Sequence, residues 1–266
     1  MTKIEIKNLT FNYDGENIFK DFSLTIDERK TAIIGQNGAG KTTLMKLLNG
    51  LLKPSEGEIF INGESSDGRE VTDLAKTVGY VFQNPNDQIF KSRIIDEVMY
   101  GPLNLGETAV EAEKAARQAL EKFDQLGLVE ENPYDLSLAE RKQIAIASVL
   151  AMETEIVIFD EPTIGQDFKG KQQLRSVIED LRQTGKTVIS ILHDMDFVAE
   201  NFERVIVLKE GQILADGTAG EVFSQEDVLR EAGLELPHIA ELSKVLGFPS
   251  LALNIADFLE LAKQTK

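Results

Sequence analysis

The sequence predicts an α/β fold built on a largely parallel sheet, with antiparallel strands ahead of it and a helical insertion within it. Two short apolar segments, Thr31–Gly35 and Ile156–Asp160, have the composition of strands that are covered on both faces. Helical spacing follows at Thr42–Leu51 and again at Lys171–Gly185. Strands that alternate with helices in this way are typical of a parallel sheet.

The elements between these segments follow from their hydrophobic periodicity. Ile4–Tyr13 and Asp21–Ile26 alternate apolar with polar residues, as half-buried antiparallel strands do. Gly57–Gly63 and Thr77–Asn84 are predicted as further strands. The pattern then becomes helical over about 92–152, which predicts the helical insertion.

The C-terminal third begins with one more predicted strand, Thr187–Asp194, and continues with a hairpin over Arg204–Gly217. The hairpin turn is predicted at Glu210-Gly211, because glycine adopts the backbone conformation that tight turns require. The tail beyond it has helical spacing. One face of the predicted tail helix carries apolar side chains: Ile255, Phe258, Leu259 and Ala262.

Composition limits the kinds of partner that the protein can have. A chain of 266 residues with 42% hydrophobic content can form one large α/β domain, with or without an appendage. The net charge of −17 argues against nucleic acid and against direct binding to an anionic lipid surface. Cysteine is absent, so we expect neither disulfides nor thiolate metal sites, which is compatible with the cytosol. Neither a signal peptide nor a run of about 18 apolar residues is present, so any membrane role must come through a partner.

The segment "GQNGAGKTT" predicts a phosphate-binding loop. It matches G-x-x-x-x-G-K-[ST] and lies between a predicted buried strand and a predicted helix, the context that this motif requires. Glycines let backbone N–H groups turn toward phosphate oxygens, and the helix N-terminus adds its positive end. Lys41 supplies a charge to the phosphates, and the Thr42 hydroxyl is suited to Mg²⁺. The alternative is an ordinary glycine-rich turn. The candidate nucleotide contacts are Gly35, Asn37, Gly38, Gly40, Lys41, Thr42 and Thr43.

The segment "IVIFDEPT" predicts the catalytic carboxylates. Its apolar run ends at Asp160, which puts a carboxylate at the C-terminal edge of the sheet, where ligand sites of α/β proteins lie. We expect Asp160 to hold the hydration shell of Mg²⁺ and Glu161 to polarise the attacking water as general base. The alternative is a pair of exposed acidic residues at the end of a strand.

In order and spacing, these motifs resemble the ATP-binding cassette (ABC) ATPases over about residues 2–218. The resemblance implies bound ATP and Mg²⁺. It gives Tyr13 the role of stacking on adenine, and His193 the role of the switch histidine that contacts the γ-phosphate. Gln83 in "VFQNPNDQIF" matches the glutamine that reaches the metal and the attacking water and couples to a membrane subunit. On their own, Tyr13 would be a strand residue facing its neighbours and His193 a packed structural histidine.

The resemblance also implies the domain organisation. We expect an ABC-type P-loop nucleotide-binding domain over residues 1–220, with a RecA-like parallel sheet core, an antiparallel β subdomain and a helical subdomain at about 91–153. A short C-terminal helical extension would occupy residues 221–266. Its apolar face either packs on its own domain or contributes to contact with a second ATPase.

A narrower resemblance is carried by "VFQNPNDQIF" and by the tail "AGLELPHIAELSKVLGFPS". Both look like the energy-coupling factor (ECF) transporter ATPases, a group that includes cobalt and nickel importer ATPases. The resemblance implies a cytosolic subunit at the membrane that pairs with a second ATPase. Together the two ATPases would drive a transmembrane coupling subunit and a membrane-embedded substrate-binding subunit, which import a vitamin or a transition-metal ion. The sequence does not identify the cargo.

The signature segment departs from the family pattern L-S-G-G-Q-[RK]-Q-R, because this chain has "LSLAERKQ" from Leu136. In the family this segment closes over the ATP of the partner subunit, which gives Ser137 a contact with the partner's ATP. Leu138 adds bulk, and the charge of Glu140 would repel a phosphate by about 1–4 kcal/mol. Alternatively, Ser137 and Glu140 form a helix capping box, which would lessen that repulsion.

The unusual signature predicts a heterodimer of unequal ATPases. The chain's own pocket keeps Lys41, Asp160, Glu161 and His193, whereas the composite site that its signature closes would be weak. In "EPTIGQD", Gln166 stands where the family has leucine. The alternatives are a non-catalytic regulatory ATP-binding subunit and a soluble ABC protein that acts on ribosomes or in DNA repair.

Overall fold

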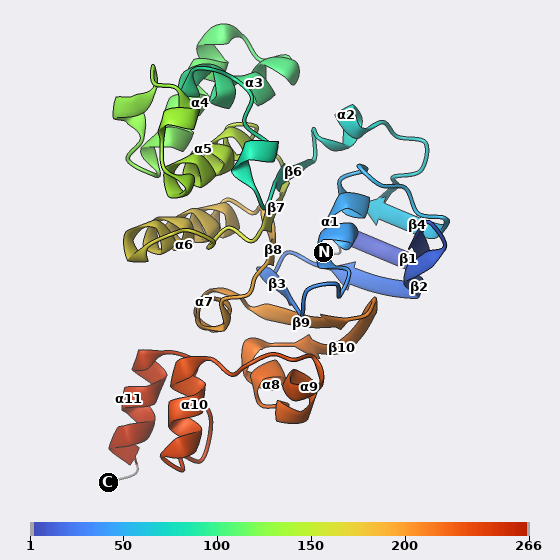
Figure 1. Ribbon diagram of the computed structural model, residues 1–266, viewed down its shortest axis with the longest axis vertical. Coiled ribbons are helices and arrows are strands. Elements are labelled where there is room, and N and C mark those ends of the chain that lie inside the picture. The colour runs from blue at the N-terminus through green and yellow to red at the C-terminus, as the bar shows by residue number, and fades with distance from the viewer. Residues whose placement is uncertain (1–2, 265–266) are drawn as a thin grey trace. The chain divides into compact units, whose positions relative to one another are not determined.

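The computed structural model describes residues 3–264. The chain folds into two compact structural units. The first unit comprises residues 3–45, 53–65 and 191–264, and the second comprises residues 46–52 and 66–190. Figure 1 follows the chain through these segments by colour. Among residues 3–264, no helix is long and apolar enough to cross a membrane.

The first unit contains an antiparallel sheet. Its strands, in the spatial order β2-β1-β4-β5, are β1 (Ile4–Tyr13), β2 (Glu16–Ile26), β4 (Glu56–Ile61) and β5 (Glu64–Ser65). Every neighbouring pair runs antiparallel, as the alternating sequence predicts. Ile4, Ile6 and Leu9 of β1 are buried, so one face of this sheet contributes to the core of the unit.

Three further strands of the first unit carry the start of the phosphate-binding loop. β3 (Thr31–Ile34) pairs in parallel with β9 (Arg204–Lys209), and β9 turns back into β10 (Gln212–Gly217). The predicted hairpin turn is confirmed, with φ of 47° at Glu210 and 73° at Gly211. Positive φ at both central residues is typical of the two-residue turns that match the twist of a hairpin.

The second unit contains the remaining parallel strands. They lie in the order β8-β7-β6 and comprise β6 (Val78–Val81), β7 (Ile156–Asp160) and β8 (Thr187–Ile191), the last residue of which already belongs to the first unit. β6 and β7 pair in parallel. All residues of these strands are buried, as their continuous apolar character predicts.

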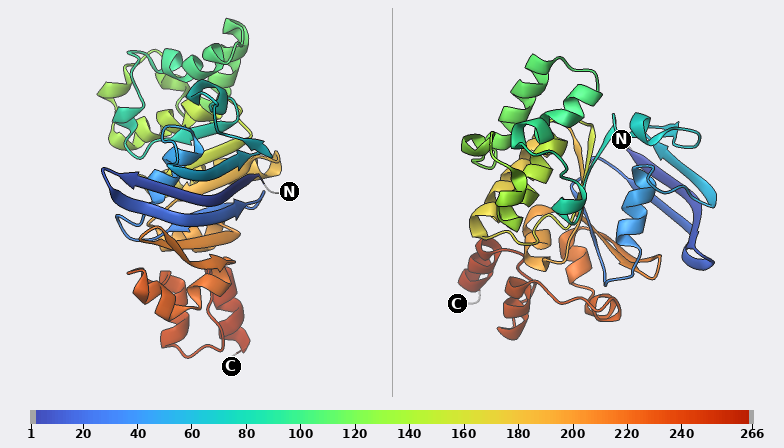
Figure 2. Two further views of the ribbon diagram at one scale, coloured as in Figure 1. Left: turned by 90° about the vertical axis from the view of Figure 1, so that its right-hand side faces the viewer. Right: turned by 45° about the horizontal axis from the view of Figure 1, so that its top comes forward.

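The helices that adjoin these strands follow the predicted pattern. α1 (Lys41–Leu48) begins after the β3 loop, α2 (Val71–Leu74) precedes β6, and α6 (Phe168–Gln183) connects β7 to β8. The insertion between β6 and β7 contains α3 (Ile94–Asn104), α4 (Ala109–Glu121) and α5 (Leu138–Leu150), which pack on one another and are coloured green in Figure 2. The α/β fold class and the helical insertion are therefore confirmed, while the exact domain boundaries stay predictions.

The C-terminal segment is helical, as predicted. After α7 (Met195–Asn201) and the β9–β10 hairpin come α8 (Ala219–Phe223), α9 (Glu226–Glu231), α10 (His238–Val245) and α11 (Ile255–Gln264). α10 and α11 lie side by side, and the Phe248 and Phe258 rings contact each other with centroids 5.2 Å apart.

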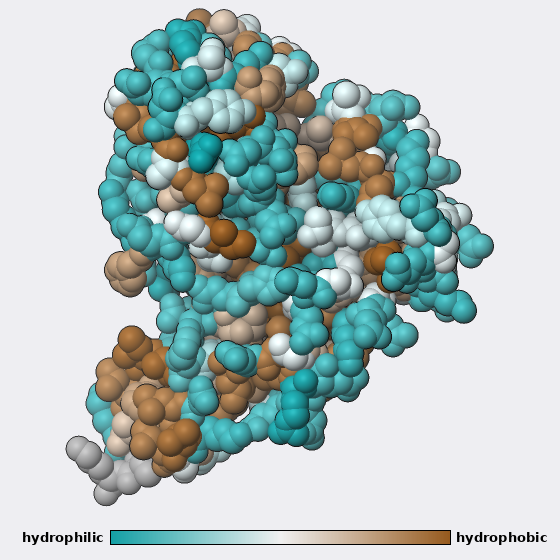
Figure 3. Space-filling view, in the orientation of Figure 1, coloured by the Kyte–Doolittle hydropathy of each residue, from teal (hydrophilic) through white to brown (hydrophobic). Residues whose placement is uncertain are grey.

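The predicted apolar face of α11 is divided by this packing. Phe258 and Ala262 are half-buried, whereas Ile255 and Leu259 remain 62% and 53% exposed. Val245 of α10 is 75% exposed, and Figure 3 shows hydrophobic side chains gathered on the visible face of these helices. Part of this apolar face thus packs within the extension. Contact of the exposed part with a second ATPase stays a prediction.

One side-chain contact ties the extension to the segment that follows His193. Asp196 in α7 accepts the His238 backbone N–H at 2.7 Å through Oδ1, and its Oδ2 contacts the His238 ring nitrogen Nδ1. This contact raises the pKa of His238, with smaller contributions from the charges of Glu241 and Asp194. The extension is therefore attached to α7 by a bond whose strength depends on the protonation of one histidine.

We expect this contact to make thermal stability depend on pH. Because the folded-state pKa of His238 is raised above its ordinary value of about 6.5, the stabilisation is fully present below pH about 6.5 and is lost as the pH rises through the folded-state pKa. Differential scanning fluorimetry of the wild type and His238→Gln from pH 5.5 to 9 measures it. The difference in Tm should be largest at low pH and shrink at high pH, and a constant difference would contradict the assignment.

Candidate functional site

The predicted phosphate-binding loop connects β3 to α1 in the first unit. Gly35, Gly38 and Gly40 have φ of 153°, 85° and 98°, which residues with a side chain rarely adopt. A Cβ on Gly35 would lie 2.1 Å from the Leu208 carbonyl oxygen, and one on Gly40 would lie 2.9 Å from the Phe19 ring. The backbone of β9 and a core aromatic therefore require glycine at both ends of the loop.

The side chain of Lys41 lies inside this loop. It is 6% exposed, and its Nζ donates to the carbonyl oxygens of Gly35 at 2.6 Å and Gln36 at 2.8 Å. Gln36, Asn37 and Gly38 form the exposed rim of the loop, and Thr42 and Thr43 are half-exposed in the first turn of α1. A held ammonium group beside a helix N-terminus favours an anion such as a phosphate.

Two segments far away in the sequence support the loop from within the first unit. The Gly211 N–H in the β9–β10 turn donates to the Ala39 carbonyl oxygen at 3.1 Å. Gly233, in the C-terminal extension, approaches the side chain of Gln36 so closely that an added Cβ would overlap it. The hairpin and the extension therefore both contact the loop.

The other predicted residues of the first unit are exposed. Tyr13, at the end of β1, is 43% exposed and lies edge-on against Phe11, with ring centroids 4.9 Å apart. Its ring therefore contacts a strand neighbour and also remains accessible, so both interpretations of this residue stay open. His193, two residues beyond the end of β8, is exposed, and the next residue, Asp194, caps α7 by accepting the Phe197 N–H at 3.0 Å.

The second unit brings the predicted carboxylates and Gln83 together. Asp160 is fully buried at the end of β7, and the Tyr80 hydroxyl donates to its Oδ2 at 2.7 Å. The burial of Tyr80 and the neighbouring Asp160 carboxylate raise the Tyr80 pKa far above its ordinary value, so the hydroxyl stays a donor. One oxygen of Asp160 is thereby oriented from the neighbouring strand.

Glu161 has a strained backbone. Its φ is 48°, in the left-handed region that costs a non-glycine residue about 1–2 kcal/mol. Its side chain is largely buried, and Oε2 accepts from Gln83 Nε2 at 3.0 Å. Strain of this kind at a buried carboxylate is typical of functional sites, and here it directs Glu161 toward Gln83.

The residues predicted to contact Mg²⁺ form a chemically suitable set. Thr42, Gln83 and Asp160 offer a hydroxyl, an amide and a carboxylate oxygen, which are the hard ligands that Mg²⁺ takes. Because the amide nitrogen of Gln83 is bonded to Glu161, its amide oxygen is the atom available to a metal. Within residues 3–264 no group of three or more His, Cys, Asp or Glu side chains is arranged to hold a metal ion. The oxygen atoms of the three residues suit the chemistry of Mg²⁺, and binding of Mg²⁺ by these residues stays a prediction.

The predicted capping box at the signature segment is confirmed. The Glu140 carboxylate accepts from the Ser137 hydroxyl at 2.6 Å and from the Ser137 N–H at 2.9 Å, and the Glu140 N–H donates back to the Ser137 hydroxyl at 3.3 Å. These bonds lower the pKa of Glu140. Leu138, the first residue of α5, is 43% exposed. Glu140 thus folds back onto its own helix, and the Ser137 hydroxyl proton points to Glu140.

Lys142 is a candidate functional residue that the sequence analysis missed. It is 1% exposed, and its Nζ donates to the carbonyl oxygens of Phe82 at 2.8 Å, Gln83 at 2.9 Å and Asp160 at 2.9 Å. Burial lowers its pKa to about 8, although the charges of Asp160 and Glu161 act in the opposite direction. Its spacing of four residues from the buried Ile146 was the available signal that Lys142 faces the core.

A chain of glutamine side chains was also missed. Gln125 donates to Gln143 at 2.7 Å, Gln143 to Gln166 at 3.0 Å, and Gln166 to the Ala139 carbonyl oxygen at 3.0 Å. Asp167, next to Gln166, caps α6 by accepting the Gly170 N–H at 2.8 Å. Gln166, which stands where the family has leucine, therefore bonds the segment after β7 to the first turn of α5.

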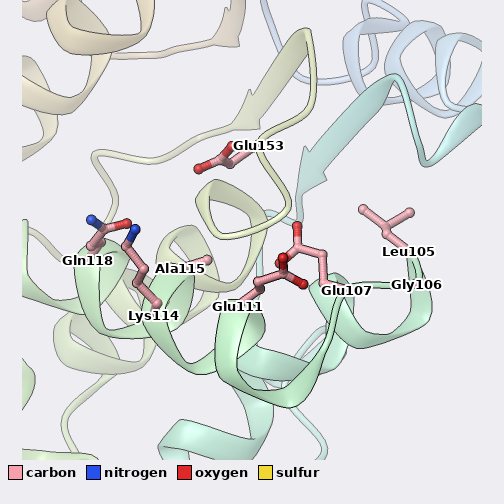
Figure 4. Close-up of a pocket in the computed structure, with 8 residues that line it drawn as sticks. All are labelled: Leu105, Gly106, Glu107, Glu111, Lys114, Ala115, Gln118 and Glu153. Carbon is pink, nitrogen blue, oxygen red and sulfur yellow. The ribbon is translucent and has the colours of Figure 1, made fainter.

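The pocket drawn in Figure 4 is separate from the predicted residues. It is a shallow hollow of about 430 Å³ beside α4, and the carboxylates of Glu107 and Glu111 lie close together at its rim. Its lining consists of Leu105, Gly106, Glu107, Glu111, Lys114, Ala115, Gln118 and Glu153, none of which is a predicted site residue.

Comparison with known proteins identifies the family. The family described as "ABC transporter" matches residues 19–164, which is more than half of the chain. The chain belongs to the ABC transporter family. This ABC ATPase binds and hydrolyses ATP, as the sequence analysis predicts.

Individual relatives resemble the chain over nearly its whole length. A putative ABC transporter ATP-binding protein of Pyrococcus horikoshii is 38% identical over 259 residues, covering 97% of this chain and 98% of that protein. The energy-coupling factor transporter ATP-binding protein EcfA of Methanocaldococcus jannaschii is 39% identical over 247 residues, covering 91% of this chain and 88% of EcfA. The predicted similarity to ECF ATPases is thus confirmed.

The fold agrees with these sequence matches. The structure of cbiO1 from Clostridium perfringens, described as part of the ABC transporter complex cbiONQ, superposes with a TM-score of 0.77 and 34% identity. The superposition covers 91% of this chain and 99% of cbiO1. The ABC-type fold is therefore confirmed, while the contacts of individual residues with ATP or Mg²⁺ stay predictions.

We expect Gly35→Ala to damage the loop far more than Gly38→Ala. Both residues have positive φ, so each substitution costs about 1–2 kcal/mol of backbone strain. Only Gly35 adds a collision with the Leu208 carbonyl oxygen, whereas nothing lies within 4 Å of a Cβ on Gly38. Thermal denaturation and fluorescent-ATP binding measure the difference. Equal effects of the two substitutions on Tm and affinity would contradict this account of the loop.

Proposed function

We propose that the chain is the ATP-hydrolysing subunit of an ECF-type importer, bound to the cytoplasmic face of a membrane through partner subunits. It would power uptake of a vitamin or a transition-metal ion. The observation that carries this proposal is the match to EcfA over 247 residues at 39% identity, which exceeds the predicted cassette and extends into the C-terminal tail. The name of EcfA connects that protein to energy-coupling factor transport.

The geometry supports a division of roles in ATP hydrolysis. The loop N–H groups and Lys41 bind the β- and γ-phosphates, and Tyr13 stacks on adenine. Thr42, Gln83 and Asp160 are the residues that would hold Mg²⁺, which would supply charge neutralisation at the phosphate oxygens. These residues orient the γ-phosphate for in-line attack, and positioning with charge neutralisation contributes most of the catalysis.

Activation of the attacking water is the proposed role of Glu161 and Gln83, and His193 is proposed to contact the phosphate that the water attacks. Glu161 accepts the proton of the water as general base, and Gln83, which is bonded to Glu161 at 3.0 Å, orients the water. His193 contacts the γ-phosphate. The burial of the Glu161 side chain and its bond to Gln83 support this role, because they bring a carboxylate and an amide together at one edge of the sheet.

The signature segment supports pairing with a different ATPase. Leu138 adds an exposed apolar side chain where the family has glycine, and the Ser137 hydroxyl is engaged by Glu140. Even folded back, Glu140 brings a negative charge to the end of the helix that would face the partner's ATP. A homodimer would contain two such weakened sites, so a heterodimer with an intact partner signature fits better.

An exposed aromatic cluster supports docking of a membrane subunit. Phe90 and Tyr100 are 55% and 43% exposed and meet edge-to-face with ring centroids 4.8 Å apart. The ammonium of Lys91 lies 4.7 Å from the centre of the Tyr100 ring. Tyr134, 48% exposed, donates to the Ile89 carbonyl oxygen at 2.6 Å. Exposed aromatic side chains that lie together in this way are typical of a protein interface.

The second candidate is a regulatory subunit that binds ATP without hydrolysing it. It is favoured by the engaged Ser137 hydroxyl and by Gln166, which holds its segment against α5. The contact between Gln83 and Glu161 favours hydrolysis instead. Substitution of Glu161 in the assembled complex separates the two candidates.

Isolation in detergent from the native membrane tests the proposal. We expect a second ATPase and two small membrane proteins to accompany the chain, and the complex to hydrolyse ATP faster than the isolated chain. Glu161→Gln should lower hydrolysis by the complex by about 10²–10⁴-fold, whereas Glu121→Gln, an exposed control on α4, should not. Isolation with ribosomes or DNA-repair proteins would contradict the transport proposal. Unchanged hydrolysis with Glu161→Gln would favour the regulatory candidate.

Restoring the signature should strengthen the composite site that this chain closes. We expect Leu138→Gly, Ala139→Gly and Glu140→Gln, combined in a complex that also carries Glu161→Gln, to raise the remaining ATP hydrolysis. Removal of a repulsion of at least about 1 kcal/mol corresponds to a rate increase of about fivefold or more. The Glu161→Gln background silences the other pocket, so the remaining turnover reports the restored site. No increase, with the fold intact by circular dichroism, would contradict the weak-site interpretation.

A further inference from the structure

Lys142 is a buried ammonium group to which the mechanism above gives no role. It belongs to α5, one turn beyond the Ser137 cap, and only 1% of its surface is exposed. A lysine ammonium has three N–H donors, and here the carbonyl oxygens of Phe82, Gln83 and Asp160 accept all of them at 2.8–2.9 Å. The group is therefore fully satisfied and geometrically fixed.

The acceptors lie at the ends of two neighbouring strands. β6 and β7 pair in parallel, with Val81 opposite Phe159, so the chain leaves both strands at the same edge of the sheet. Lys142 binds the first residues after β6 and the last residue of β7. Two of its acceptors are the carbonyls of Gln83 and Asp160 themselves, the residues proposed to reach the metal.

A purely structural link would not require a buried charge. Desolvation of an ammonium group is unfavourable, and a neutral donor can bond to carbonyl oxygens. Lys142 nevertheless stands here, with all three of its donors bonded to carbonyl oxygens at the ends of the two strands that lead to Gln83 and Asp160.

We propose that Lys142 is a positioning residue for ATP hydrolysis. It holds the backbones of Gln83 and Asp160 so that their side chains meet the metal and the attacking water. Tyr80 holds Asp160 from the other side through the carboxylate, so the backbone and the side chain of Asp160 are both fixed. The inference rests on the proposed function, because it assigns Lys142 to the same metal and water site.

The experiment compares Lys142→Met, Lys142→Gln and Lys142→Arg in the detergent-purified complex. Methionine removes the donors, glutamine keeps neutral donors, and arginine keeps both donors and charge. Lys114→Met, an exposed lysine on α4, is the matched control. Binding of a non-hydrolysable ATP analogue is measured with EDTA present, and Mn²⁺ binding to the analogue-loaded complex is measured by electron paramagnetic resonance. Steady-state kcat and KM for ATP complete the set.

We expect Lys142→Met to leave metal-free binding of the analogue within about twofold, since the phosphate-binding loop is untouched. It should weaken one class of Mn²⁺ site, and lower kcat, by about 10–100-fold, the usual effect of losing a group that orients metal ligands. Lys142→Gln should show the same loss in milder form, and Lys142→Arg should recover part of both quantities. Lys114→Met should behave as the wild type.

The outcomes separate this inference from the proposed function. Unchanged Mn²⁺ affinity and kcat in Lys142→Met would overturn the role of Lys142. The same result in Lys142→Gln would overturn it where the methionine variant does not fold. Equal loss of metal-free binding and of Mn²⁺ binding would also overturn it, because a collapsed pocket and not a displaced metal ligand would be the cause. A wild-type complex that binds no ATP analogue would instead overturn the proposed function, and this inference with it.

Discussion

The parallel pairing of β6 with β7 is the interaction on which the catalytic half of the candidate site depends. Parallel strands end at the same edge of a sheet, so Gln83 and Asp160, 77 positions apart in the sequence, become neighbours. Every residue of the two strands is buried, so the register of their ends is held by a close-packed core. The contact between Gln83 and Glu161, the bond from Tyr80 to Asp160 and the three bonds that Lys142 donates all follow from this pairing.

The phosphate-binding loop depends on a different constraint, the close approach of backbone to backbone. β9 lies so near Gly35 that its carbonyl oxygen occupies the space of a side chain, and the turn of the same hairpin donates a hydrogen bond to Ala39. Lys41 then satisfies the loop carbonyls from within. The loop is thus shaped by strands that pair beside it, and its motif residues supply the chemistry.

Local signals in the sequence were sufficient to predict the helices, the strands and several short-range contacts. Glycine at position 211 predicts the hairpin turn, and the spacing of Ser137 and Glu140 predicts a cap that the structure contains, because both depend on residues at most three positions apart. Lys142 and the glutamine chain depend on partners 18–60 positions away, which only the tertiary packing around α5 brings near. The divided face of α11 was missed for the same reason, since α10 decides which of its apolar residues are covered.

Helix α5, which follows the signature segment, has both local and long-range contacts. Its first turn is shaped by a local cap in which Glu140 satisfies Ser137, and its second turn is held by Lys142 against the ends of two strands. Gln166 bonds to the carbonyl of Ala139 between them, so this short stretch of helix has partners in three separate segments of the chain. A helix end held in this way has little freedom to rearrange around a phosphate. The departures from the family pattern at Glu140 and Gln166 therefore constrain the same helix end, and reversing one of them alone leaves the bonds of the other in place.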